Sequence, residues 1–96
     1  MVYIVIRDEF NSEGKRSGRR VRVFEDMDDA YDDVIIDLEH LIKTDDEYPR
    51  FRNLVRTIMS GEDNLDRYNQ LEELYESLSQ NDEDFFMFDI LESEIY

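Results

Sequence analysis

The sequence predicts an α+β domain in which a small antiparallel sheet of three strands carries helices packed on one face. Three changes in the hydrophobic pattern lead to this prediction. Apolar residues follow the period of a strand in residues 2–24, the period of a helix in residues 26–79, and the period of a strand again in residues 84–95. We therefore expect the element order ββαααβ and a single domain over residues 1–96.

The first quarter of the chain is expected to be a β-hairpin with a basic loop. Residues 2–6 are apolar on both alternating faces, which is typical of a central strand. Residues 11–19, "NSEGKRSGR", contain two glycines and two serines and predict a long flexible loop. Residues 20–24, "RVRVF", alternate as the returning strand.

Three helices are expected next. Residues 26–43 repeat apolar side chains at i, i+3, i+4 and i+7, the pattern of an amphipathic helix. A proline suited to a first helical turn opens a second helix over residues 48–60, which stops at Gly61. The segment "EDN" provides caps for a third helix over residues 64–79.

The last strand is expected over residues 84–95 and is apolar on both faces. One face carries Phe86, Phe88 and Ile90, and the other carries Phe85, Met87 and Leu91. Helices cover only one side of so small a sheet, so the second face either stays open for a partner or a second subunit, or is covered by one helix that wraps around. Both alternatives remain open at this point.

Charge is the strongest compositional feature. The chain has a net charge of −15, and its distribution is uneven: residues 1–24 contain six basic and three acidic side chains, and the remainder contains five basic and 23 acidic side chains. Such a field attracts cationic partners and repels nucleic acid and anionic membranes. Without cysteine there is no disulfide framework or zinc–thiolate site, and with neither a signal peptide nor a membrane span we expect a cytoplasmic protein.

The first helix holds seven carboxylates in the fourteen residues from Asp26 to Glu39. At a rise of about 1.5 Å per residue this is one charge per about 3 Å, close to the phosphate spacing of about 3.4 Å along a DNA strand. Several of these acids are i, i+4 pairs, whose repulsion disfavours the helix, so folding alone does not explain them. Two interpretations follow: an acidic surface that only keeps the protein soluble, or a surface that mimics a nucleic-acid backbone.

Mimicry of a nucleic-acid backbone would depend on a defined set of acidic residues. The predicted partner-binding set consists of Asp28, Asp29, Asp32, Asp33, Asp37, Glu39, Asp45, Asp46 and Glu47. Replacing Asp29, Asp33 and Asp37 with Asn is expected to leave folding intact and to weaken a target complex. The secondary contact is the basic loop with Arg16, Arg19 and Arg20. Four roles are open for this loop: keeping the protein soluble, pairing with the acidic helix, contacting a protein partner, or binding phosphates directly.

No pattern names a reaction. His40 follows Asp37 by one turn, but a carboxylate-bridged metal site needs a second such pair on a facing helix. The acidic clusters lack the glycine that a calcium-binding loop requires at its sixth position. We therefore expect no catalytic, cofactor-binding or metal-binding residues, and a protein that is not an enzyme.

In size, charge and clustered acids over residues 25–96, the chain resembles the small acidic accessory proteins of bacteriophages, including DNA-mimic anti-restriction and anti-CRISPR proteins. Residues 61–71, "GEDNLDRYNQL", are similar to a Gly-Glu-Asn-Leu-Asp segment of barstar-type ribonuclease inhibitors. Both resemblances imply an inhibitor of a cationic nucleic-acid enzyme. The leading hypothesis is therefore a phage-encoded, non-enzymatic inhibitor that blocks a basic site on a nucleic-acid-handling or defence protein of the host. The alternatives are an interaction or assembly module that uses an exposed apolar sheet face, and a nucleic-acid binder that uses the basic hairpin.

Overall fold

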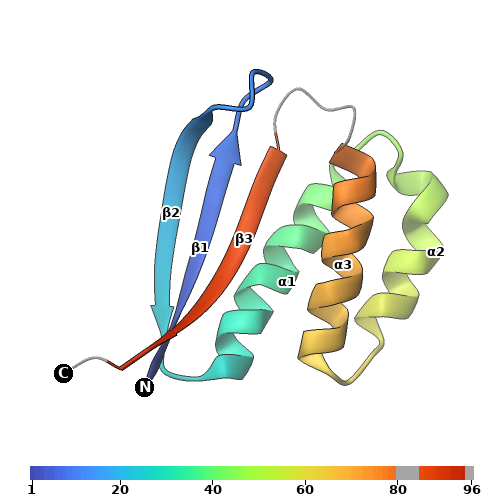
Figure 1. Cartoon of the computed structure of the whole chain (residues 1–96). Helices are drawn as coiled ribbons and strands as arrows, with labels where there is room; N and C mark the ends of the chain where they lie inside the picture. The colour runs from blue at the N-terminus through green and yellow to red at the C-terminus, as the bar shows by residue number, and fades with distance from the viewer. Residues whose placement is uncertain (80–84, 95–96) are drawn as a thin grey trace.

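The computed structural model describes residues 1–79 and 85–94, and it confirms the predicted fold class and element order. Strands β1 (Val2–Phe10), β2 (Arg16–Phe24) and β3 (Phe85–Ser93) form one antiparallel sheet in the order β2-β1-β3, with the first strand central as predicted. Figure 1 shows the three strands on one side of the molecule and the helices on the other. Asp84 and Ile95, the predicted ends of the last strand, lie outside the described residues.

The hairpin is tighter than the sequence suggested. The prediction of a nine-residue loop is wrong, because β2 begins at Arg16 and pairs with β1 from there onward. The turn is closed by Asn11, whose side-chain oxygen accepts hydrogen bonds from the backbone N–H groups of Glu13 and Lys15. Gly14 has a φ of 79°, a backbone conformation that glycine adopts without a steric penalty. Arg16 and Arg19 therefore belong to a strand.

The helices are α1 (Met27–Lys43), α2 (Tyr48–Met59) and α3 (Asn64–Ser79). Asp26 caps α1 by accepting a hydrogen bond from the backbone N–H of Asp28, and Asp63 accepts from the N–H of Leu65 at the start of α3. Proline lies in the first turn of α2, where its missing N–H has no helical partner to lose. Among the described residues, no helix has the length and apolar character needed to cross a membrane.

The core lies between the sheet and α1 and continues into the neighbouring helices. α1 contacts all three strands and packs most extensively against α3, while α2 lies on the outside of the helical layer (Figure 1). The sheet contributes two buried side chains, Val5 of β1 and Phe88 of β3. The buried side chains from the helices are Ala30, Val34, Ile35, Leu38, Ile42, Val55, Ile58, Leu71, Leu74, Tyr75 and Leu78.

Candidate functional site

Two acids of α1 face the sheet and form a network with arginines from two strands. Asp33 lies 2.7 Å from Arg22 and 3.7 Å from Arg20, and Asp37 contacts Arg20 directly and lies 3.5 Å from Arg7. We call these five side chains the ion-pair cluster. The periodicity of each element places them together: arginines at i and i+2 lie on one face of β2, and aspartates at i and i+4 lie on one face of α1. The cluster is partly shielded, since the side chains of Asp33 and Asp37 are only 12% and 21% exposed.

The ion-pair cluster corrects one expectation. The acids of the first helix were expected to contribute nothing to folding, and this is wrong for Asp33 and Asp37, whose charges join α1 to β1 and β2. Of the alternatives for the basic hairpin, pairing with the acidic helix is the one that the structure shows for Arg20 and Arg22. The spacing of these residues was visible in the sequence, but the side of the sheet that α1 covers was not.

The rest of the predicted partner-binding set divides by exposure. Asp28, Asp29 and Asp32 are exposed on α1, and Asp46 and Glu47 are exposed between α1 and α2. Glu39 pairs with Lys43 one turn later on the same helix and raises the pKa of that lysine. Asp45 accepts a hydrogen bond from the backbone N–H of Glu47. The nine residues therefore do not form one continuous free surface.

The exposed acids of α1 are joined by acids in the first turn of α3 and in the segment just before it. The side-chain amide of Asn64 donates to Asp32 at 3.2 Å and to the backbone carbonyl of Asp28 at 3.4 Å, so the N-terminal ends of α1 and α3 lie side by side (Figure 1). The resulting acidic end of the helical layer consists of Asp28, Asp29, Asp32, Glu62, Asp63 and Asp66. The positive ends of two helix dipoles favour carboxylates there.

The sheet face turned away from the helices is apolar, and none of the described helices covers it. In the register, Ile4 of β1 lies between Val23 and Leu91, and Ile6 lies between Val21 and Asp89. This open face consists of Val2, Ile4, Ile6, Asp8, Phe10, Arg16, Arg19, Val21, Val23, Phe85, Met87, Asp89, Leu91 and Ser93. Val21, Val23, Met87 and Leu91 are each about half exposed, from 49% to 55%. Of the two alternatives for the second face of the sheet, the structure therefore has the uncovered one.

The open face carries Asp89 on β3 and a charged patch near the hairpin. Arg19 donates two hydrogen bonds to the carboxylate of Asp8, at 2.7 and 3.2 Å, and Arg16 lies 3.9 Å from the same carboxylate. The hydrogen bond from Arg19 lowers the pKa of Asp8 below its ordinary value. Phe10 and Phe85 stack beside this patch, with ring centroids 5.1 Å apart. The arginines predicted to lie in a mobile loop are thus held on a strand.

The outer edge of β3 is partly closed by tyrosines of α3. The hydroxyl oxygen of Tyr75 accepts a hydrogen bond from the backbone N–H of Phe86 at 3.1 Å, and the hydroxyl of Tyr68 donates to the carbonyl of Phe88 at 3.4 Å. Burial raises the pKa of Tyr68, with a further contribution from Glu72. These contacts occupy backbone groups that an added strand would need.

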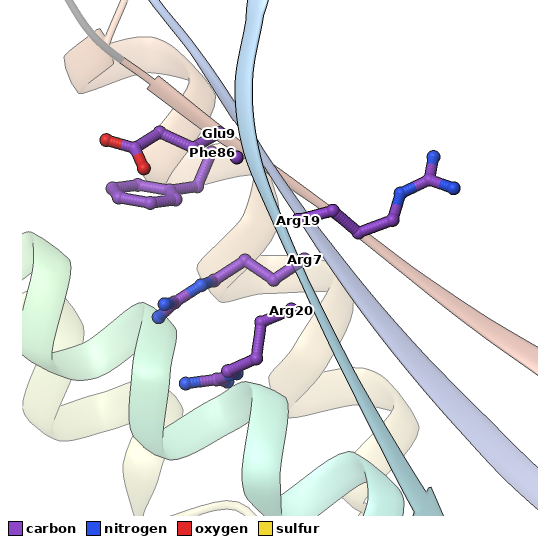
Figure 2. Close-up of a pocket in the computed structure, with 6 residues that line it drawn as sticks. Arg7, Glu9, Arg19, Arg20 and Phe86 are labelled. Carbon is purple, nitrogen blue, oxygen red and sulfur yellow. The ribbon is translucent and has the colours of Figure 1, made fainter.

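A small hollow near the hairpin is lined by side chains that point to opposite faces of the sheet (Figure 2). Arg7 and Arg20 reach toward α1, whereas Arg19 points to the opposite side of the sheet. The guanidinium of Arg7 lies 5.0 Å from the centre of the Phe86 ring, a cation–π contact. Arg7 and Arg20 already pair with aspartates, so this hollow displays little unpaired positive charge to an anionic ligand.

His40 is exposed in the last turn of α1, and its neighbour Asp37 belongs to the ion-pair cluster. Within residues 1–79 and 85–94, no group of three His, Asp or Glu side chains is placed to hold a metal ion.

The protein is an α+β domain whose three-stranded sheet is covered by helices on one face only, with an apolar face opposite them and acidic side chains on the helical layer. Comparison with protein-family models, with curated proteins and with solved structures finds no match.

Proposed function

We propose that this chain is a binding module that docks a protein partner through the open face of its sheet. The observation that supports the proposal is the half exposure of Val21, Val23, Met87 and Leu91 on the two strands that flank β1. A contiguous apolar surface with a charged margin is typical of a protein interaction site. The expectation of a cytoplasmic compartment remains part of this proposal, supported by a sequence without cysteine.

The experiment is a binding comparison with matched variants. Val23→Glu places a charge in the open face, and Leu54→Glu places the same charge at a similarly exposed apolar position on α2. Each variant and the wild type is immobilised and exposed to lysate from the source organism, and bound proteins are quantified. Loss of a specific partner with Val23→Glu but not with Leu54→Glu supports the proposal. Equal retention by both variants contradicts it.

Charge mimicry is the second candidate, and the acidic end is the observation that favours it. Asn64 holds the N-terminal ends of α1 and α3 together, so acids from both helices present one surface of negative charge. In this candidate, Asp28, Asp29 and Asp32 bind a basic site on a nucleic-acid-handling or defence protein, whereas Asp33 and Asp37 serve the fold. The triple change of those three exposed aspartates to Asn would then weaken the complex, and salt would weaken it steeply.

The ion pairs of the hairpin disfavour direct binding of nucleic acid there. The three arginines that it needs are each within 4.0 Å of a carboxylate: Arg16 and Arg19 near Asp8, and Arg20 near Asp33 and Asp37. Phosphate would have to displace these partners while approaching a protein of net charge −15.

A further inference from the structure

We propose that the partner of the open face is a second copy of this chain, packed face to face so that the two helical layers point outward. This inference rests on the proposed function, which requires only that the open face binds a protein. It adds the identity of the occupant and a geometry for the complex.

The distribution of charge allows two copies to meet at this face. The four charged side chains of the open face are Arg16, Arg19, Asp8 and Asp89, two of each sign. They sum to zero, so the net charge of −15 lies on the remaining residues. A face-to-face dimer directs those residues away from the interface. With two sheets about 10 Å apart, the helical layers are separated by more than the Debye length of about 8 Å at physiological salt.

The charges of the open face are also complementary to themselves. A two-fold axis that runs along β1 between the two sheets places β2 of one copy over β3 of the other. Arg19 on β2 is paired in the register with Asp8, and Asp89 on β3 is two residues from Met87, which flanks the same Asp8. In the dimer, Arg19 of each copy therefore comes within side-chain reach of Asp89 in the other copy. Symmetry makes this contact twice.

Packing on the face is favoured over extension of the sheet at its edges. The outer edge of β3 has backbone groups hydrogen-bonded to Tyr68 and Tyr75. The outer strand β2 has four arginines in nine residues, and charged side chains on an edge strand oppose pairing with another strand. The open face has no such protection, since four of its apolar side chains are about half exposed.

The size of the face limits the area that the dimer can bury. Three strands of nine residues have a footprint of about 30 Å by about 14 Å, or roughly 400 Å² per copy. Two footprints approach the roughly 1,000 Å² of the smaller specific interfaces, because accessible area follows the relief of the side chains. We therefore expect a reversible dimer with a micromolar Kd.

Sedimentation equilibrium tests the proposal over about 5 to 500 μM protein, a range that spans a micromolar Kd. The expected result is a monomer–dimer equilibrium for the wild type and for Leu54→Glu. Val23→Glu is expected to raise the Kd at least about tenfold, and because Val23 is 55% exposed on an outer strand, the variant is expected to fold. Leu91→Lys, on the other outer strand, is the second variant should Val23→Glu fail to give a native circular dichroism spectrum.

A charge swap identifies the cross-contact. Arg19→Asp and Asp89→Arg alone each place like charges together twice, and both are expected to weaken self-association. An equimolar mixture restores both contacts as opposite-charge pairs in the heterodimer. At one contact the two changed side chains face each other, and at the other the original Arg19 and Asp89 face each other. The mixture is therefore expected to associate more tightly than either variant alone.

Two results overturn the dimer: a monomeric wild type at the highest concentration, or equal association of Val23→Glu and the wild type. If the wild type is monomeric but binds a different protein, and Val23→Glu loses that protein, the dimer is refuted and the proposed function is supported. If Val23→Glu changes neither self-association nor partner binding, both the dimer and the proposed function are refuted.

Discussion

Neutralising Asp33 is expected to destabilise the fold, although the residue is one of six acids in α1. Asp33 lies 2.7 Å from Arg22 and 3.7 Å from Arg20, and its side chain is 12% exposed. Exposed ion pairs contribute up to about 1 kcal/mol, and removing one partner of a buried pair costs about 3–5 kcal/mol. Because Arg20 is 27% and Arg22 is 51% exposed, the cost of Asp33→Asn lies between these limits, near about 1.5 kcal/mol. For a domain of this size, this lowers the thermal midpoint by about 6–12 °C.

The assay is urea unfolding followed by circular dichroism, with Asp29→Asn as the matched control. Asp29 is exposed on the same helix, one turn before Asp33. Its replacement relieves repulsion but loses a favourable dipole interaction, so the change is expected to stay within about 0.5 kcal/mol. A double-mutant cycle with Arg22→Gln is expected to show coupling with Asp33→Asn. Equal stability of Asp33→Asn and Asp29→Asn, together with additive effects in the cycle, would refute this account of the ion-pair cluster.

Three further predictions concern the edge of β3, the open face and Tyr68. Tyr75→Phe removes the acceptor for the backbone N–H of Phe86 and is expected to cost about 1 kcal/mol in urea unfolding and to speed amide exchange at that residue; unchanged exchange would contradict the assigned contact. Asp8→Asn tests pH dependence, because the pKa of Asp8 is lower in the folded state than in the unfolded state. The stabilising effect of its carboxylate is therefore fully present above the unfolded pKa of about 3.9 and is lost as the pH falls through the lower folded pKa. Wild type and Asp8→Asn are therefore expected to differ in thermal midpoint at about pH 6 and to converge under strongly acidic conditions, and a gap that persists there would argue against the Arg19 pair. Burial raises the pKa of Tyr68, so an alkaline absorbance titration of Tyr68→Phe is expected to lose a phenol that ionises above the ordinary range, whereas loss of one that ionises within that range would contradict the assignment.

The order of the elements was predictable because the hydrophobic period changes where the elements change. The apolar character of both faces of the last strand was also predictable, since Phe85, Met87 and Leu91 alternate with Phe86, Phe88 and Ile90, but the sequence left open whether a helix covers the second face. The assignment of roles among the acids was not. Asp29, Asp33 and Asp37 follow at i, i+4 and i+8 on one helix, but only the packing of α1 on the sheet decides that the last two meet arginines. The length of the hairpin loop was misjudged because the glycines and serines of residues 11–19 masked a strand that begins at Arg16.

The contacts of Tyr68 and Tyr75 were beyond the sequence for a similar reason. Their spacing along α3 indicated only a face that packs inward. That their hydroxyl groups reach backbone atoms of β3 depends on how closely α3 approaches the sheet edge, which no periodicity encodes.

The dependence of self-association on salt tests most directly whether the open face, rather than the acidic surface, is the binding surface. Between about 0.1 M and about 1 M salt, the Debye length falls from about 10 Å to about 3 Å. Apolar packing between two chains of net charge −15 predicts a Kd that stays constant or decreases over this range, because salt screens the repulsion between the copies. A Kd that increases steeply with salt would contradict the account and would indicate that attraction between opposite charges, rather than apolar packing, holds the two copies together.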